Sequence, residues 1–278
     1  MKIVVVFTCF NRKDKTYKCI DSLTNGNGEH EVSFVVVNDG STDGTKEMLE
    51  ELQKNYNVHV INTENKFYSA GMRIGMEHLL SQTTQYDYLM LVNDDVDFKE
   101  GCISLLIEQS VLQKNAVIVG TTVNSSGNWV NPDGLENYGA IKYTHGIKYE
   151  TLGSNDWKTK VDSFNANCVL IPYEAFRKTG AMDKSYRHSL GDFDYGFALK
   201  RNGSEIYPSK DVVGYCDRNS SKGTWTDPNN GIWKRIKLKE SVKGQPFKPW
   251  FHYLLKNFGL RYAIYYSLTP YIRIFIKR

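Results

Sequence analysis

The first half of the sequence alternates short β-branched runs with segments of helical pattern, and this alternation limits the possible folds more than any other feature. Continuous apolar strands separated by helices are typical of βαβ units, in which helices cover both faces of a parallel sheet. Because such crossovers are almost always right-handed, we expect an α/β fold with a doubly wound, mostly parallel sheet. The predicted strands are 2–8, 31–39, 57–62, 86–92 and 116–123, and the predicted helices are 13–25, 43–55, 69–83 and 99–114.

The second half of the chain has a weaker pattern. Residues 124–164 are rich in Gly, Asn, Tyr and Lys, which indicates short strands and a long loop. Gly259 and Pro270 interrupt the last helical pattern, so we expect that helix to be broken at both residues. The later predicted elements are a strand at 162–172, helices at 173–180, 192–202, 231–242 and 248–276, and a loop at 216–230.

The composition narrows the class of protein. A length of 278 residues suits one large α/β domain, with or without a smaller appendage. The five cysteines are scattered without a Cys-x-x-Cys pair, which argues against a disulfide framework and against a cysteine zinc site. The sequence shows no signal peptide and no apolar stretch of about 18 residues, so the expected location is the cytoplasm.

The C-terminal tail differs in charge from the rest of the chain. From residue 243 to the end there are seven Lys or Arg residues and no Asp or Glu, whereas the whole chain has a net charge of +4. Aromatic and aliphatic residues lie between these charges, a composition typical of a helix at a membrane interface. The tail therefore predicts docking on an anionic membrane surface. A helical pair packed on the main domain and a homodimer contact are the alternatives.

The predicted strands end in polar segments. These segments are "TCFNR" (8–12), "NDGST" (38–42), "NTEN" (62–65) and "NDDVD" (93–97). Ligands of doubly wound sheets bind beyond the carboxyl ends of the strands. Four polar strand ends along one edge therefore predict a binding site, although loops after strands are commonly polar.

The segment "YLMLVNDDVDF" gathers carboxylates at the end of a buried strand. Alternation along the strand would place Asn93, Asp95 and Asp97 on one side, with Asp94 on the other. Massed carboxylates are costly unless a cation joins them, and oxygen ligands select Mg²⁺ or Mn²⁺. An ion held by one or two carboxylates completes its shell with water and substrate phosphates. The alternative is a solvated acidic turn.

The segment "VVVNDGSTDGT" places Asp39 directly after another buried strand. The Asp39 carboxylate can accept a hydrogen bond from a base imide or a ribose hydroxyl, and Gly40 lets a ligand approach the backbone. The residues 41–43 can cap the following helix, whereas Asp39 lies too far upstream for that role.

The segment "GDFDYGFALKRNG" (191–203) begins a predicted helix with Asp192 and Asp194. Taken alone, Asp192 is most simply a helix cap, and Gly203 ends the helix after a positively charged last turn. The helix dipole would lower the pKa of Asp192 and keep it ionised, so capping and proton acceptance are compatible.

These motifs, taken in order, resemble those of family 2 glycosyltransferases. The matching segments are "TCFNRKDKTYKCIDSL", "VVNDGSTDGT", "LMLVNDDV" and "GDFDYGFALKRNG", and the resemblance covers about residues 2–220. It implies the GT-A fold and an inverting, metal-dependent transfer from a nucleoside diphosphate sugar. The sequence looks most like bacterial enzymes that build capsule, O-antigen or other surface polysaccharides, including those that transfer rhamnose.

The resemblance divides the chain into a catalytic domain at 1–230, with a nucleotide-binding half at 1–123 and an acceptor-binding half at 124–230, and a basic aromatic helical segment at 231–278. Asp39 would hold the uracil or thymine of a UDP- or dTDP-sugar, and Asp94 would contact the ribose. Asn93 replaces the first residue of the family's Asp-x-Asp, which leaves Asp95 as the Mn²⁺ or Mg²⁺ ligand. The implied nucleotide-sugar contacts are Thr8, Phe10, Asn11, Arg12, Asp39, Asn65, Gly71, Arg73, Asn93, Asp94, Arg218 and Lys222.

The resemblance also implies the catalytic and acceptor residues. Asp192 falls on the family's catalytic base, where Gly191 replaces the usual preceding Glu, and Asp194 takes a supporting catalytic role. Asp217 or Asn219 would have to add a metal ligand. The implied contacts with a glycan or lipid-linked acceptor are Asn165, Asn167, His188 and Trp225. A solvated loop or a structural side chain is the alternative for each of these.

Other functions fit the sequence less well. A metal-dependent phosphohydrolase would need a nucleophilic Asp where this strand ends in Asn93. A nucleotidyltransferase or an oxidoreductase would need a glycine-rich loop after the first strand, which is absent. The second hypothesis is a non-catalytic nucleotide-sugar-binding subunit, which the intact Asp39, Asp95 and Asp192 oppose. We expect no nucleic-acid partner, and a peripheral position on the inner face of the cell membrane.

Overall fold

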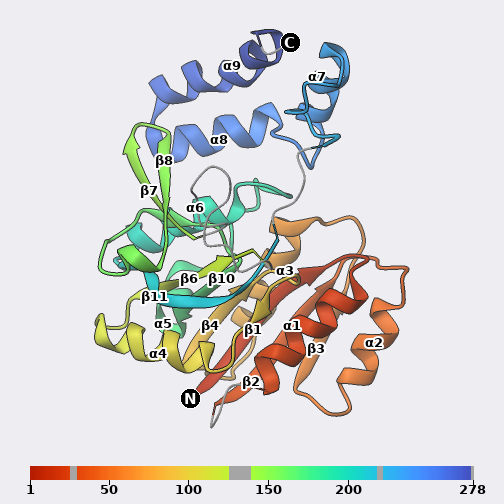
Figure 1. Cartoon of the computed structure of the whole chain (residues 1–278), viewed down its shortest axis with the longest axis vertical. Helices are drawn as coiled ribbons and strands as arrows, with labels where there is room; N and C mark the ends of the chain where they lie inside the picture. Colours follow the sequence, from red (N-terminus) through yellow and green to blue (C-terminus); the bar gives the residue numbers. More distant parts are fainter. Residues whose placement is uncertain (26–29, 125–138, 218–221, 277–278) are drawn as a thin grey trace.

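The main sheet has eight strands in the order β3-β2-β1-β4-β10-β6-β11-β5 (Figure 1). The computed structural model describes residues 1–25, 30–124, 139–217 and 222–276. The strands β3, β2, β1 and β4 are parallel, and β6 is parallel to β11, whereas β10 and β5 run antiparallel to their neighbours. The strands are β1 (Lys2–Cys9), β2 (Glu31–Asn38), β3 (Val58–Asn62), β4 (Tyr88–Val92), β5 (Asp97–Phe98), β6 (Val117–Val123), β10 (Cys168–Pro172) and β11 (Ile206–Tyr215). The predicted mostly parallel sheet is confirmed.

Helices cover both faces of this sheet because successive strand residues, apolar on both sides, point to opposite faces. One face of β1 carries Val5 and Phe7 and packs under α1, α2 and α4. The opposite face carries Val4 and Val6 and packs under α3, α5 and α6. These helices are α1 (Lys13–Asn25), α2 (Thr45–Leu52), α3 (Tyr68–Ser81), α4 (Cys102–Leu112), α5 (Tyr173–Thr179) and α6 (Gly191–Arg201).

A second, three-stranded antiparallel sheet has the order β8-β7-β9. Its strands are β7 (Ala140–His145), β8 (Lys148–Leu152) and β9 (Ser163–Phe164), and a single 3₁₀ turn, η1 (Ser154–Asp156), follows β8. The residues 165–167 join β9 to β10 of the main sheet. The predicted strand at 162–172 is therefore two strands of different sheets, with a turn between them.

The strand β11 is absent from the prediction, which placed no strand between residues 206 and 215. Its sequence contains Pro208, and its pairing with β6 shifts register between Pro208 and Val212 and again between Val212 and Gly214. Such irregularities break the alternation that marks a strand in a sequence. Pairing with β6 stabilises this strand. Such a contact between distant residues cannot be recognised in the local sequence pattern.

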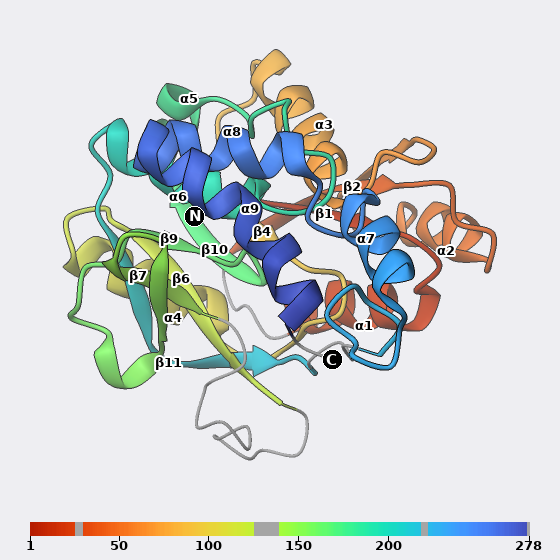
Figure 2. The same ribbon diagram turned by 90° about the horizontal axis from the view of Figure 1, so that it is seen from above.

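Three helices complete the chain: α7 (Ile232–Glu240), α8 (Phe247–Phe258) and α9 (Leu260–Ile276). Gly259, with φ of 89°, separates α8 from α9 as predicted, whereas Pro270 lies inside α9 and does not end it. Figures 1 and 2 show α8 and α9 side by side, with α8 nearer to α6. Tyr253 and Leu254 of α8 form a small core with Tyr186 and with Ala263 of α9, so the helical pair packs on the main domain.

An ion-pair cluster fastens α8 to the first turn of α6. Lys256 Nζ lies 2.7 Å from Asp194 Oδ2 and 2.8 Å from Asp183 Oδ2. Asn257 Nδ2 donates to Asp194 Oδ1 at 2.9 Å. The Asp194 side chain is only 2% exposed, so its charge depends on these two partners.

We expect the substitution Lys256→Met to lower the free energy of unfolding by about 2–4 kcal/mol, because it leaves a buried carboxylate without its cation. Urea denaturation followed by circular dichroism measures this loss. Lys248→Met, on the exposed first turn of the same helix, is the matched control and should change stability by about 0.5 kcal/mol or less. Equal effects of the two substitutions would show that the cluster does not fasten α8.

Candidate active site

Two joined cavities lie at the carboxyl edge of the main sheet. The first, of about 570 Å³, is lined by Asp39 and by the 8–12 segment, and we name it the Asp39 cavity. The second, of about 300 Å³, is lined by Asp95 and Asp192, and we name it the Asp192 cavity. Both linings include Thr8, Arg12, Tyr68, Asp94 and His188, so the cavities form one continuous site. The structure therefore brings together the polar strand ends, as predicted.

Asp39 organises the loop that follows β3. Its Oδ1 accepts hydrogen bonds from Thr63 Oγ1 at 3.0 Å and from the Lys66 N–H at 2.7 Å. Its Oδ2 accepts from the Phe67 N–H at 2.8 Å. Phe67 has a φ of 68°, and the neighbouring Asn65 has a φ of 53°, values that a non-glycine residue adopts only when its surroundings impose them. The carboxylate thus fixes the wall of the Asp39 cavity that carries Asn65 and Phe67.

The end of β1 supplies another wall of the Asp39 cavity. Thr8 Oγ1 donates to the Val37 carbonyl at 3.0 Å, and Asn11 Oδ1 accepts from the Thr42 N–H at 2.7 Å. The first bond joins the ends of strands β1 and β2, and the second joins the loops that follow them. Phe10 is 50% exposed on the rim, where its ring can stack on a base. Of the predicted nucleotide contacts in the first half, Thr8, Phe10, Asn11, Arg12, Asp39, Asn65, Asn93 and Asp94 line the joined cavities.

Gly71 and Arg73 do not line either cavity, contrary to the prediction. Gly71 packs α3 against β1, and a Cβ at this position would lie 2.6 Å from Thr8 Oγ1. The Arg73 side chain runs along α3 to Glu77, at 3.5 Å. The glycine therefore serves close packing, and the arginine points along its own helix.

Asp94 and Asp95 converge on one guanidinium. Arg12 Nη1 lies 3.1 Å from Asp94 Oδ1 and 2.8 Å from Asp95 Oδ2. The predicted separation of these aspartates onto opposite sides is wrong, because β4 ends at Val92 and residues 94 and 95 form a turn. Burial raises the pKa of Asp94 to about 6, although Arg12 opposes the shift. Burial lowers the pKa of Arg12, but the two carboxylates together raise it above the ordinary value, so the guanidinium stays charged.

The residues around Asp95 fit a divalent cation in part. Asp95 and Asp217 both line the Asp192 cavity and a neighbouring hollow of about 270 Å³, which places two carboxylates beside the same space. Oxygen ligands of this kind suit Mg²⁺ or Mn²⁺ completed by phosphate and water. Among the described residues, no group of three or more His, Cys, Asp or Glu could hold a metal ion.

Asp192 lies at the other side of the Asp192 cavity, in the first turn of α6. Its Oδ2 accepts from the Ala166 N–H at 3.2 Å, and its Oδ1 accepts from the Phe193 N–H at 3.0 Å. The residue is 7% exposed, and burial raises its pKa to about 6 against the effect of these bonds. The prediction that this pKa is lowered overall is therefore wrong, because burial outweighs the lowering effect of the N–H groups at the start of the helix. The expected capping role is also wrong, because Leu190 is the N-cap and makes no side-chain capping bond.

Close packing accounts for Gly191 where the family usually has Glu. A Cβ on Gly191 would lie 2.5 Å from Ser69 Oγ of α3, so a larger residue would separate the two helices. Ser69 Oγ also donates to the His188 carbonyl at 2.6 Å. The short side chain thus brings the first turn of α6, with Asp192, against the first turn of α3.

Some of the remaining predicted residues line the Asp192 cavity, some lie away from both cavities, and two lie outside the described residues. Asn165, Asn167 and His188 line the Asp192 cavity. Asp194 lines neither cavity, because it faces α8, and Lys222 and Trp225 are also absent from both linings. The residues that lie outside the described part of the chain are Arg218 and Asn219.

Several residues that line the site escaped prediction, among them Tyr68 and Lys243. Tyr68 lies between the cavities, and burial together with the charges of Asp192, Asp95 and Asp94 raises its pKa well above the ordinary value. Lys243, from the segment between α7 and α8, lines the Asp39 cavity. Burial and the charge of Lys243 lower the pKa of His188, which favours its neutral form. Lys243 belongs to none of the matching segments, so only the fold reveals its place beside the site.

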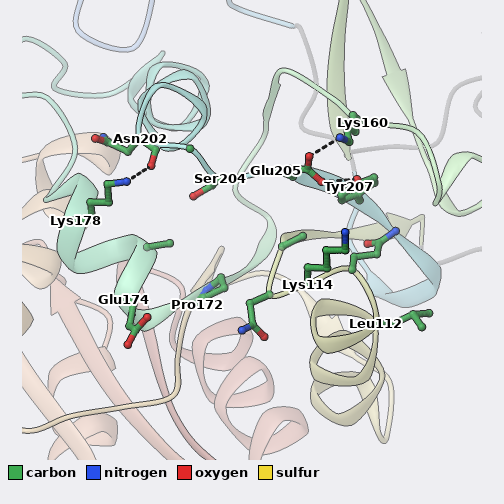
Figure 3. Close-up of a pocket in the computed structure, with 15 residues that line it drawn as sticks. Leu112, Lys114, Lys160, Pro172, Glu174, Lys178, Asn202, Ser204, Glu205 and Tyr207 are labelled. Carbon is green, nitrogen blue, oxygen red and sulfur yellow. Dashed lines mark hydrogen bonds and ion pairs between the residues drawn. The ribbon is translucent and has the colours of Figure 1, made fainter.

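Figure 3 shows a larger hollow, of about 670 Å³, at the opposite edge of the main sheet. It lies where β10 ends at Pro172, and its rim carries Lys160 and Lys178. Lys160 pairs with Glu205, and Lys178 Nζ donates to the Asn202 carbonyl at 2.6 Å. The carboxylates of the four motifs lie at the other edge, so we place the candidate active site there.

The sheet, its covering helices and the carboxylates of the joined cavities define an α/β protein of the GT-A class. The family model described as "Glycosyl transferase family 2" matches residues 4–180, which is more than half of the chain. The chain therefore belongs to glycosyl transferase family 2, and the predicted family is confirmed.

Two curated proteins share part of this sequence. Glycosyltransferase GlyA of Streptococcus pneumoniae serotype 4 is 27% identical over 120 residues, which are 43% of this chain and 16% of that protein. Teichoic acid poly(glycerol phosphate) polymerase of Staphylococcus epidermidis is 24% identical over 111 residues, which are 39% of this chain and 15% of that protein. The aligned segments thus span about a sixth of these relatives.

Solved structures share the fold over nearly the whole chain. TarS 1–349 of S. aureus, in complex with UDP-GlcNAc, has a TM-score of 0.59 and 12% identity, and the match covers 99% of this chain and 81% of that one. The mannosyltransferase PcManGT from Pyrobaculum calidifontis, in complex with GDP-Man and Mn²⁺, has a TM-score of 0.58 and 14% identity, with 98% and 73% covered. At these identities the similarity establishes the fold.

The raised pKa of Asp192 predicts a stability change with pH. Its folded-state pKa of about 6 lies above the ordinary value of 3.8, so ionisation disfavours the folded state. The stability that Asp192 contributes is complete below pH ~4 and is lost as the pH rises through ~6. Asp192→Asn should therefore raise the free energy of unfolding at pH 7.5 by about 1–3 kcal/mol, with the gain vanishing near pH 4.

Urea denaturation between pH 4 and pH 7.5 measures this difference. Asp211→Asn, at an exposed position on β11, is the control and should show no such dependence on pH. A loss of stability in Asp192→Asn at pH 7.5 would contradict the raised pKa.

Proposed function

We propose that the chain is an inverting glycosyltransferase that moves a sugar from a UDP- or dTDP-sugar to a hydroxyl group of a glycan or lipid-linked acceptor. The observation that carries the proposal is the placement of Asp192. Its buried carboxylate faces the same cavity as Asp94 and Asp95, and that cavity opens into a larger one beside Asp39. The nucleotide would occupy the Asp39 cavity, and the reacting sugar would lie between Asp95 and Asp192.

Asp192 would act as the general base. An inverting transfer needs a group that removes the proton of the acceptor hydroxyl while that oxygen attacks the anomeric carbon from the face opposite the diphosphate. With a pKa of about 6, Asp192 is ionised at neutral pH and accepts a proton more readily than an ordinary aspartate. Backbone N–H groups of Ala166 and Phe193 orient the carboxylate.

Positive charge would stabilise the leaving diphosphate. Lys243 and Arg12 both line the Asp39 cavity, and Arg12 also forms an ion pair with Asp95. A bound Mn²⁺ or Mg²⁺, with Asp95 and Asp217 as protein ligands, would neutralise charge that develops on the diphosphate. Lys222 and Arg218 stay proposed donor contacts, and Arg218 lies outside the described residues.

The names of the similar proteins support this proposal. TarS was solved with UDP-GlcNAc and PcManGT with GDP-Man and Mn²⁺, both nucleoside diphosphate sugars. The two curated relatives are a glycosyltransferase and a teichoic acid polymerase. We therefore propose a role in capsule, O-antigen or another cell-surface polymer, with residues 1–123 binding the nucleotide and 124–230 forming the acceptor-binding half.

Calorimetry with UDP, dTDP and GDP, with and without Mn²⁺, tests the donor site, and we expect at least one nucleotide to bind.

Asp192→Asn should lower sugar transfer or donor hydrolysis by about 10²–10⁴-fold, because it removes the base, while nucleotide affinity changes less than about threefold. Asp211→Asn is again the control. Absence of binding by every nucleotide would refute the proposal, and binding without turnover by the unaltered chain would favour a non-catalytic subunit.

We also propose that the outer faces of α7 and α9 dock on an anionic membrane. Exposed apolar side chains cover these faces: Trp233, Ile264, Tyr265, Leu268, Ile272, Phe275 and Ile276. Basic residues lie beside them, and residues 243–276 contain no acid. Such a face suits a negatively charged interface. No helix among the described residues is long and apolar enough to span a membrane, so the proposed contact is peripheral.

Sedimentation with phosphatidylglycerol vesicles tests the docking face. We expect the chain to bind at low salt and to dissociate as salt rises, because salt screens the basic residues. The variant Trp233→Ser/Leu268→Ser/Ile272→Ser should bind at least tenfold more weakly. Val111→Ser/Leu112→Ser, at exposed apolar positions of α4, is the matched control. Failure to bind vesicles would refute docking, and a dimer in sedimentation velocity would assign the face to a second copy.

A further inference from the structure

Buried polar atoms without a hydrogen-bond partner are concentrated around the Asp192 cavity. Eleven such side-chain atoms occur among the described residues, and five of them belong to residues that line this cavity. The five atoms are Tyr68 Oη, Asn93 Oδ1, Asn165 Oδ1, Asn167 Nδ2 and His188 Nδ1. Because buried polar atoms in folded proteins nearly always have partners, this concentration indicates a polar ligand that supplies them.

Asn93 and Asn167 form a fixed amide pair. Asn93 Nδ2 donates to Asn167 Oδ1 at 2.5 Å, and the Asn93 backbone N–H donates to the Asn167 carbonyl at 3.2 Å. The pair therefore joins the end of β4 to the start of β10. One acceptor, Asn93 Oδ1, and one donor, Asn167 Nδ2, stay without partners. If both side-chain amides are rotated by 180°, Asn167 donates to Asn93 instead. One amide oxygen and one amide nitrogen of the pair again stay without partners.

The amide pair is next to the proposed base. Ala166, between Asn165 and Asn167, donates its backbone N–H to Asp192 Oδ2 at 3.2 Å. The turn 165–167 thus carries the base contact and one half of the amide pair within three residues. A group bound to the amide pair lies within the cavity that also holds Asp192.

The chemistry of the lining favours hydroxyl groups. A hydroxyl both donates and accepts, so neighbouring sugar hydroxyls match an array in which amide oxygens, an amide nitrogen and a tyrosine hydroxyl alternate. A sugar carboxylate would meet mainly negative charge. The charged lining consists of Asp94, Asp95, Asp192 and Asp217, with Arg12 as the cation, and Arg12 is held by Asp94 and Asp95.

We propose that the Asn93–Asn167 pair binds neighbouring hydroxyls of the donor sugar and that the Asp192 cavity selects neutral sugars over uronic acids. This inference rests on the proposed function and adds the class of sugar and the residues that recognise it. Asn167 is a specificity residue here, because it contacts the sugar ring and takes no part in proton transfer.

Calorimetry compares UDP, dTDP and GDP with UDP-glucose, UDP-galactose, UDP-N-acetylglucosamine, dTDP-glucose and GDP-mannose. In the wild type, at least one sugar nucleotide should bind more tightly than its free nucleotide. Asn167→Asp retains the oxygen that accepts from Asn93 and removes the unpartnered donor, so it should weaken that sugar nucleotide about tenfold or more. Affinity for the free nucleotide should change less than twofold, which also shows that the variant is folded.

Asn62→Asp is the matched control. Asn62 Oδ1 accepts from Asn38 Nδ2 at 2.9 Å in a partly buried amide pair between β2 and β3, so the same chemical change occurs away from the Asp192 cavity. It should change neither affinity more than twofold. A second comparison uses the wild type alone, in which UDP-glucuronate should bind at least tenfold more weakly than the tightest neutral UDP-sugar.

The outcomes separate this inference from the proposed function. If no free nucleotide and no sugar nucleotide binds, the proposed function fails, and the sugar assignment fails with it. If nucleotides bind but Asn167→Asp weakens the affinity for the free nucleotide and for the sugar nucleotide equally, the amide pair does not recognise the sugar. If UDP-glucuronate binds as tightly as the neutral sugars, the cavity does not select by charge.

Discussion

The contact between Arg12 and the aspartate pair after β4 is the interaction on which the site depends. The Asp94 and Asp95 side chains are 7% and 6% exposed, and two buried carboxylates this close are tolerated only beside a cation. Arg12 belongs to the segment between β1 and α1, so its guanidinium ties the ends of two neighbouring strands. Thr16 of α1 adds a longer bond to Asp94 Oδ2 at 3.4 Å. These contacts join the start of α1 to the aspartate pair, and Arg12 and Asp94 line both cavities.

A second set of contacts positions the first turn of α6, which carries Asp192 into the Asp192 cavity. The first turn of α6 is held from one side by the Ala166 N–H, which bonds Asp192, and from another by Lys256 and Asn257 of α8, which bond Asp194. The two aspartates of the same turn thus have different tasks, because one faces the cavity and the other faces the C-terminal helices. The segment after α7 also brings Lys243 to the Asp39 cavity. The C-terminal helices are therefore part of the site's support and more than an appendage to it.

The sequence predicts the first half of the fold well and the electrostatics of the site poorly. Strands β1 to β4 and helices α1 to α4 follow the predicted segments within a few residues, because their apolar periodicity is regular. β11 escapes prediction because Pro208 and two register shifts interrupt its pattern. Asp192 and Asp94 occur at the predicted edge, but their raised pKa values come from burial, which depends on residues distant in sequence. For the same reason Tyr68 and Lys243 become visible only when the chain is folded.

The burial of these polar groups is costly, and this cost has a functional meaning. Burial disfavours the ionised forms of Asp94 and Asp192, and five polar atoms around the same cavity have no partner. A ligand that brings hydroxyl groups to the unpartnered atoms relieves part of this cost, and a cation beside the carboxylates relieves another part. Binding free energy would then come from hydrogen bonds to the unpartnered polar atoms. A ligand without hydroxyl groups at the matching positions would gain little affinity. The proposed selectivity for the donor and the cost of burying these groups therefore have the same physical origin.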